Sequence, residues 1–425
     1  MHDDVTRPIP RITETGHRHG HGHGHGHGPV PPASRRVRRL LTILLAPLAV
    51  AAVVALFLLY PWHSTEIAPP GGQQTPVRGD VTATAAAPCS TQAQGPADCI
   101  AVSVRMSDGP AKGSDVRILS PNEPTTPRFA VGDPVVLSYA GSDPLAGTSY
   151  RLVDFQRTTP LVLLAVLFAV AVLLLGRWQG LAALGALVLS FVVLLLFVLP
   201  AIIAGENPLL VGVVGAGVIM FAVLYLTHGL TARTSTAVLG TLVSLALTGL
   251  LGALFSAVSR LTGLDEDTSY LVAGLGHPID TRGLLLAGVV IGALGVLDDV
   301  TVTQTSAVWE LRRANPALGW RELYASGQRI GRDHMSSAVN TLVMAYTGAA
   351  LPVLLYSSIS GVGIGTILTS QSIAQEIVRA LVGSIGLIAA VPVTTALAAL
   401  VAVQEPAAKR PSGKRQPSRA SRRNG

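Results

Sequence analysis

The amino-acid sequence predicts an all-α integral membrane bundle of about eight transmembrane helices, with a small extracytoplasmic β-domain after the first helix. Three observations support this class. Hydrophobic residues make up 49% of the 425 residues and charged residues only 13%, and the mean hydropathy is +0.50. Eight apolar runs approach or exceed the roughly 20 residues that a membrane-spanning helix needs. Between the first two runs lies a longer stretch with the short alternating patterns and turn residues that are typical of strands.

These runs divide the chain into five parts. Residues 1–39 form a His- and Arg-rich cytoplasmic tail, 40–60 the first transmembrane helix, 61–159 the outer linker and β-domain, 160–403 a seven-helix membrane domain, and 404–425 a basic cytoplasmic tail. The eight predicted spans are Leu40–Tyr60, Pro160–Leu175, Leu181–Ile203, Leu209–Leu226, Ser235–Val258, Leu284–Trp309, Ser337–Tyr356 and Ala380–Val403.

The N-terminal tail carries a histidine at every second position within HRHGHGHGHGHG. Neutral imidazoles in such a tract can chelate Zn(II), Ni(II) or Cu(II). The alternative is a disordered low-complexity tail that binds metal only because any histidine repeat does. No other cofactor is expected. The six candidate ligands are His17, His19, His21, His23, His25 and His27.

Four arginines between Arg35 and Arg39 precede the first apolar run, as in a signal peptide. We favour a membrane anchor, because the run is longer than the apolar core of a typical signal peptide. The sequence Tyr60-Pro61-Trp62 that follows is typical of a membrane interface and lacks the small residues of a cleavage site.

The outer segment contains the runs CIAVSVRM, SDVRILS, DPVVLSY and TSYRLVDF, separated by DG, KG, GD and GS turn pairs. This alternation predicts a small β-domain. Cys89 and Cys99 are the two cysteines of the chain, and both lie in this segment, where an oxidising compartment favours a disulfide. A redox or metal site is the weaker alternative, because two cysteines without a nearby histidine do not complete a structural zinc site.

The positions of the basic residues predict the orientation, because short cytoplasmic loops are enriched in Lys and Arg. With both termini inside, the cytoplasmic side receives the two basic tails and the five arginines between Arg312 and Arg332. The short outer loops then hold Arg260, Arg282 and Arg379. The net charge of +7 comes largely from the tails, so it indicates topology and contact with anionic lipids and argues against nucleic-acid binding.

Asp298 and Asp299 stand next to each other inside the sixth predicted span, LLLAGVVIGALGVLDDVTVTQTSAVW. A carboxylate at this depth costs roughly 3 kcal/mol, so such residues usually mark ion or proton paths. Successive helix positions differ by about 100°, so the two carboxylates line adjacent faces. Asp298 shares its face with Thr301 and Thr305. Asp299 belongs to a stripe along one helix face, with small residues before it and polar residues after it. Close helix approach is expected at the small residues and shared hydrogen bonds at the polar ones. The stripe comprises Gly288, Gly292, Gly295, Asp299, Thr303, Ser306 and Glu310.

The seventh predicted span supplies a candidate opposite wall, with Ser337, Asn340 and Thr341 on one side and Asn340 as the expected partner of the aspartates. The fifth span carries small and polar residues four apart, which indicates tight packing rather than chemistry. The five positions are Gly240, Ser244, Thr248, Gly252 and Ser256.

Two segments, GALGVLDDVTVTQTSAVWELRRANP and GRDHMSSAVNTLVMAYTGAALPVLL, resemble the characteristic segments of the YibE/F-like family of bacterial multi-pass membrane proteins. The resemblance covers roughly Leu161 to Val403. It implies a protein of the bacterial plasma membrane whose biochemical activity is largely unassigned. GVLDDVTV with its following polar helix is also similar to the central helices of resistance-nodulation-division permeases and of SecD/SecF export factors. That similarity implies proton binding at Asp298 and Asp299.

Three functional classes follow. The first is an ion- or proton-coupled transporter, or a protein that energises transport, with the aspartates as proton-binding groups and an ion or small molecule as substrate. The second is an accessory or assembly protein whose outer β-domain binds a protein partner. The third is an intramembrane aspartyl protease, which is disfavoured because adjacent residues on one helix do not face each other across a water. We therefore expect no enzyme, and the sequence has no nucleotide-binding loop to supply energy.

Overall fold

The computed structural model describes residues 34–63, 74–89, 99–124, 126–141, 143–264, 269, 272, 278–359, 361 and 363–405. The six histidines of the N-terminal tail and all but the first two residues of the C-terminal tail lie outside these ranges. The metal site predicted on the histidines therefore stays a prediction.

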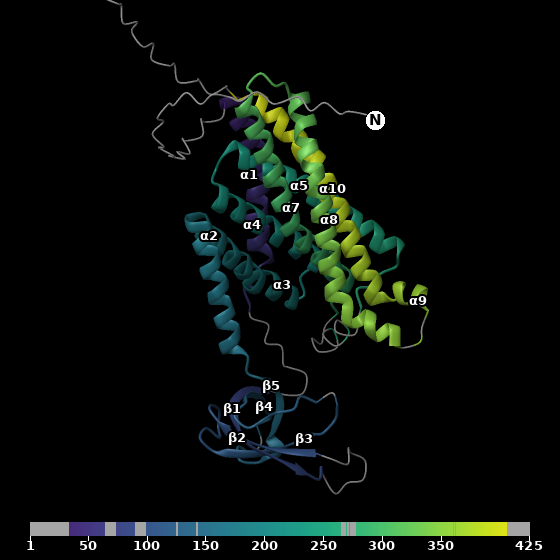
Figure 1. The fold of residues 1–425 in the computed structure, drawn as a ribbon. Helices are drawn as coiled ribbons and strands as arrows, with labels where there is room; N and C mark the ends of the chain where they lie inside the picture. The colour runs from purple at the N-terminus through teal and green to yellow at the C-terminus, as the bar shows by residue number, and fades with distance from the viewer. Residues whose placement is uncertain are drawn as a thin grey trace, which may run out of the picture. The chain divides into compact units, whose positions relative to one another are not determined.

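Seven helices within the described ranges are long and apolar enough to cross a membrane (Figure 1). Three short helical segments accompany them: η2 (Leu194–Val198) and α3 (Leu199–Ile203), which continue α2, and α9 (Ile364–Leu368). The long helices are α1 (Arg35–Leu59), α2 (Thr158–Val193), α4 (Pro208–His228), α5 (Ala232–Val258), α7 (Thr281–Ala314), α8 (Trp320–Ile359) and α10 (Gln371–Val403).

Seven long helices contain the eight predicted spans, because the second and third spans lie in one 46-residue helical segment, Thr158–Ile203. At 1.5 Å per residue this segment would measure about 69 Å, more than twice the hydrocarbon thickness of a bilayer. It bends at Arg177, whose backbone is non-helical with φ 49° and ψ −125°. Gly180 then packs so closely against the carbonyl oxygen of Val172 that no side chain would fit there. The bend thus separates the two predicted spans.

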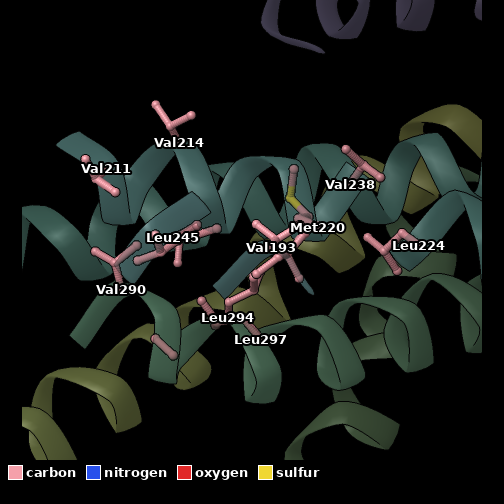
Figure 2. Close-up of a cluster of buried hydrophobic side chains, with 14 of the residues drawn as sticks. Val193, Val211, Val214, Met220, Leu224, Val238, Leu245, Val290, Leu294 and Leu297 are labelled. Atoms are coloured by element: carbon pink, nitrogen blue, oxygen red, sulfur yellow. The ribbon is translucent and has the colours of Figure 1, made fainter. Parts of the chain in front are cut away.

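The core of the bundle is formed mainly by α4, α5, α7 and α10, together with the end of the α2–η2–α3 segment (Figure 2 shows part of it). Helix α4 is apolar on all sides, as expected for a helix surrounded by other helices and lipid. Its Gly212 packs on Ala287 of α7, since an added Cβ would lie 2.6 Å from the alanine Cβ. The buried side chains include Val193, Val211, Val214, Met220, Leu224, Val238, Leu245, Val290, Leu294 and Leu297.

Three contacts fix the directions of the central helices. Thr241 of α5 contacts Thr301 of α7, and Gly252 of α5 lies beside Val289 of α7, so these helices are antiparallel. Thr395, near the end of α10, contacts Gln304 in the second half of α7. Helix α10 is therefore parallel to α7. Helices α8 and α10 run side by side (Figure 1).

The segment between α1 and α2 forms a five-stranded antiparallel sheet with strand order β3-β2-β1-β4-β5. Alternate residues of the strands point into one apolar core that includes Val104, Val135 and Leu137. Gly147, just before β5, lies against the carbonyl group of Arg117 in β3, and this contact curls the sheet into a half-barrel. The strands are β1 (Thr75–Ala87), β2 (Cys99–Met106), β3 (Asp115–Pro121), β4 (Pro134–Tyr139) and β5 (Tyr150–Phe155).

The predicted disulfide joins Cys89 to Cys99. It links the second residue after β1 to the first residue of β2, so it closes the connection between two paired strands. The small β-domain and its disulfide are both confirmed.

Candidate functional site

Helix α7 carries the Asp pair in its interior. The helix begins after Asp280, whose side chain accepts a hydrogen bond from the backbone N–H of Gly283 at 2.9 Å, a normal N-cap. It continues for 34 residues to Ala314. At 1.5 Å per residue the helix is about 51 Å long, so both aspartates lie well inside a segment that exceeds the bilayer core.

Asp298 faces the inside of the bundle. Its side chain is largely buried, and its Oδ1 atom has no hydrogen-bond partner among the described residues. Thr301 and Thr305, predicted to share this face, are fully buried. The Thr301 hydroxyl donates to the backbone carbonyl of Asp298 at 3.1 Å. The predicted grouping of these three residues on one inward face is therefore what the structure shows.

Asp299 lies on the adjacent, open face. Its side chain is 76% exposed, and its Oδ2 atom lies 4.0 Å from Nε2 of His334 on α8. The two neighbouring carboxylates thus have different surroundings. One is enclosed by helices and the other is open.

The stripe that contains Asp299 is continuous, as predicted, but none of the described helices packs closely on its three glycines. A Cβ added to Gly288 or Gly295 would meet nothing within 4 Å, and at Gly292 it would meet only the Tyr346 hydroxyl, 3.1 Å away. The expectation of close helix approach along the stripe is therefore wrong. The reason is that α8 leans on α10 here, with Leu342 against Gly383.

The predicted wall on α8 also differs from expectation. Ser337, Asn340 and Thr341 are exposed, and the Thr341 hydroxyl donates to the carbonyl of Ser337 in its own helix at 3.0 Å. Within the described ranges no hydrogen bond joins Asn340 to either aspartate. His334, one turn and a half earlier on α8, is the residue that approaches Asp299.

Two further predicted residues lie between the Asp pair and the basic end of α7. Thr303 is half-buried. The hydroxyl of Ser306 donates to the carbonyl of Val302 at 2.6 Å and accepts a hydrogen bond from the guanidinium group of Arg233 on α5. Ser306 therefore ties the start of α5 to the second half of α7.

A buried polar contact between α7 and α10 was not predicted from the sequence. Gln304 is fully buried, and its Oε1 accepts a hydrogen bond from the hydroxyl of Thr395 at 3.1 Å. Gly331 of α8 lies against the same amide. The signal was present in the sequence, because Gln304 is one turn from Thr301, and Thr394 and Thr395 stand together in an apolar span. Polar residues inside membrane helices point to function by default.

The small and polar residues of α5 do serve tight packing, as predicted. Gly240 lies against Thr394 of α10, and the side chains of Leu286 and Val289 of α7 lie near Gly252. All five positions of this stripe are buried. This face of α5 thus forms the contact with α7 and α10.

Trp309, the last residue of the sixth predicted span, is only 4% exposed and lies in a cluster of small and apolar side chains. The start of α8 and the end of α10 cover it. Its indole N–H donates to Oε2 of Glu405 at 3.0 Å. Burial raises the pKa of Glu405, against the opposing effects of this hydrogen bond and of nearby Arg313.

Metal ligation offers no second site in the part of the chain that the structure describes. No group of three or more His, Cys, Asp or Glu side chains there could hold a metal ion. The histidine tract of the tail lies outside this part of the chain.

Comparisons with known proteins agree with the membrane domain. A family model described as YibE/F-like protein matches residues 164–404, more than half of the chain. The match includes the Asp pair and begins after the β-domain. No curated protein and no solved structure matches the chain. The more distant similarity to resistance-nodulation-division permeases and SecD/SecF is not shown.

Proposed function

The chain belongs to the YibE/F-like family, and from that premise we propose that it is a proton-coupled membrane transporter, or a protein that energises transport, with Asp298 and Asp299 as its proton-binding groups. One observation carries the proposal. A buried carboxylate oxygen of Asp298 has no partner among the described residues, while Asp299 on the adjacent face is open.

A purely structural aspartate would be expected to have a partner. Buried charges that hold helices together are paired with a cation or fully hydrogen-bonded, because an unpaired charge is costly in a low-dielectric interior. Among the described residues no Lys, Arg or His forms an ion pair with Asp298. Binding a proton removes the charge and supplies a donor. A group in this position favours reversible protonation.

Coupling requires an element that responds to the charge. Helix α8 is the best candidate, because only 6% of the residues in its most apolar stretch are buried, against 56% for α7 and 50% for α10. It touches the open face through His334 and Tyr346. We infer that protonation of the Asp pair shifts the position of α8 relative to α7, since a bound ligand favours the state that binds it better.

The cargo in this proposal is an ion or small molecule, and the energy comes from an ion gradient or a partner protein. The orientation has both termini in the cytoplasm of a bacterial cell. Arg233 at the start of α5 and Arg313 near the end of α7 lie at one end of the bundle. This basic end is the cytoplasmic one by the distribution of arginines.

The test is dye-reported proton flux in proteoliposomes that hold the purified full-length protein, with Zn(II), Ni(II) and Na+ each offered as the counter-ion. We expect flux in the wild type and its loss in Asp298→Asn and Asp299→Asn. Glu310→Gln is the matched control, because it removes a carboxylate from the same helix that is exposed and paired with Arg313. It should keep its flux.

Two results would overturn the proposal. One is no flux from well-folded wild type with any of the ions. The other is equal flux in all four proteins. Either would favour an accessory role in which the outer β-domain binds a protein partner.

A further inference from the structure

Polar side chains fill the interface between α5, α7 and α10, where a membrane bundle ordinarily has apolar ones. We call this set the inner seam. Apart from Asp298, every member is at most 1% exposed. It consists of Thr241 and Ser244 on α5, Asp298, Thr301, Gln304 and Thr305 on α7, and Thr394 and Thr395 on α10.

Direct hydrogen bonds satisfy only part of the seam. Thr241 pairs with Thr301 at 2.7 Å, and Thr395 donates to Gln304. Five polar atoms have no partner among the described residues. A buried polar atom without a partner is destabilising, and buried polar groups in proteins are almost always paired. These atoms are Ser244 Oγ, Asp298 Oδ1, Gln304 Nε2, Thr305 Oγ1 and Thr394 Oγ1.

The helix register brings two of these atoms to one level. Helices α5 and α7 are antiparallel, and Thr241 contacts Thr301. Three residues further along α5 and three residues back along α7 lead to Ser244 and Asp298. The unpaired hydroxyl of Ser244 therefore lies at the depth of the unpaired carboxylate oxygen. A water molecule between them would satisfy both atoms, because water donates and accepts hydrogen bonds.

The seam has one polar end and one apolar end. Toward the basic end, Gln304 and Thr305 lead to Ser306 and to half-buried Arg233. Eight residues separate Asp298 from Ser306, about 12 Å along the helix. On the α8 and α10 side this end is closed by the apolar cluster around Val308. Beyond Asp298, the apolar core that contains Leu294 and Leu297 blocks the way.

We propose that ordered water occupies the inner seam and conducts protons between Arg233 at the basic end and Asp298, inside the bundle rather than along the open face next to α8. The inference rests on the proposed function, because it supplies the route to the same carboxylate. The seam is thus a binding site for water and protons, with hydroxyl and amide groups as its ligands.

The first test measures hydration without measuring transport. Thr305→Cys and Ser244→Cys place thiols in the seam, and Ala216→Cys places one at an equally buried position of the apolar core on α4. The natural cysteines are joined in the disulfide. Ag+ is a small cation that reaches a buried thiol through water. In proteoliposomes we expect Ag+ to block later maleimide labelling, after denaturation, at positions 305 and 244 but not at 216. Equal labelling at all three positions would overturn the inference.

The second test measures proton flux. Thr305→Val and Thr394→Val remove an unpaired hydroxyl and keep the shape, so each should slow the flux severalfold. Thr227→Val is the control, because this half-buried hydroxyl of α4 bonds the carbonyl of Val223 in its own helix. Unchanged flux in both seam variants, with flux still lost in Asp298→Asn, would overturn the route and leave the proposed function standing. Ag+ entry with normal flux in Asp298→Asn would overturn the proposed function and leave only the hydration.

Discussion

The contact between Thr241 and Thr301 fixes the register of α5 against α7, and a double-mutant cycle can measure it. Both side chains are fully buried, and their hydroxyl oxygens are 2.7 Å apart. Valine replaces threonine with nearly the same shape and removes the hydroxyl. Each hydroxyl also lies within hydrogen-bond distance of a carbonyl of its own helix, that of Ala237 at 3.0 Å and that of Asp298 at 3.1 Å. Because a hydroxyl has one proton, one threonine donates to its own carbonyl while the other donates across the helix contact. The partner left behind in a single variant therefore keeps one hydrogen bond.

The magnitude follows from this arrangement. Hydrogen bonds between helices in a membrane contribute about 0.6 kcal/mol on average and at most about 1.7 kcal/mol in double-mutant cycles. This is less than the roughly 1–3 kcal/mol for a buried group left wholly unpaired. We expect Thr241→Val and Thr301→Val each to lower the free energy of unfolding, with a coupling of about 0.6 to 1.7 kcal/mol between them.

The assay is reversible unfolding of the full chain in mixed detergent micelles, with helix content followed by circular dichroism. Thr236→Val with Thr301→Val is the control cycle. Thr236 is equally buried, but its hydroxyl bonds only the carbonyl of Ala232 in its own helix, at 2.8 Å. Coupling no larger than that of the control cycle would show that α5 and α7 are not in this register. The placement of Ser244 beside Asp298 would then fail as well.

Three further predictions concern other parts of the chain. Gly331→Ala should lower the free energy of unfolding by about 1–3 kcal/mol, because the added Cβ would lie 2.7 Å from Nε2 of Gln304; Gly295→Ala, with nothing within 4 Å, should show no such loss in the same unfolding assay. Cys89→Ser opens the disulfide and should destabilise the β-domain by about 3 kcal/mol, seen as faster proteolysis from the outer side; equal cleavage rates would contradict this. Burial raises the pKa of Glu405 above its ordinary value of 4.5, so the folded state binds a proton at this carboxylate more tightly than the unfolded state does. This proton binding stabilises the fold at low pH, and the stabilisation is lost as the pH rises through the raised pKa. Glu405→Gln should remove that part of the pH dependence of unfolding, and an unchanged pH profile would refute it.

Much of the fold is readable from the sequence because it depends on local properties. The apolar runs predicted the membrane helices, since length and hydropathy decide whether a segment spans a bilayer. The two cysteines predicted the disulfide, because few alternatives exist for a single pair. The 3.6-residue period placed Asp298 and Asp299 on adjacent faces and grouped Asp298 with Thr301 and Thr305. Each of these conclusions needs only one segment at a time.

The features that the sequence did not predict correctly depend on the path of the chain between segments. Hydropathy separated Pro160–Leu175 from Leu181–Ile203. It did not predict that one bent helical segment contains both. The bend requires a non-helical backbone at Arg177 and close packing of Gly180. Trp309 ends an apolar run, a position that is typical of an interfacial residue. The ends of two other helices bury it.

The candidate site shows the same division. The sequence alone determined that two carboxylates stand in a membrane-length helix and that they diverge, because both facts follow from composition and helix geometry. Only the tertiary structure decided that the Asp298 side chain is enclosed by the bundle and that Asp299 faces open space. It also joined Gln304 to Thr395, 91 residues away. The physical reason is that periodicity defines which residues share a face, whereas the neighbour of that face depends on how helices far apart in the chain pack against each other.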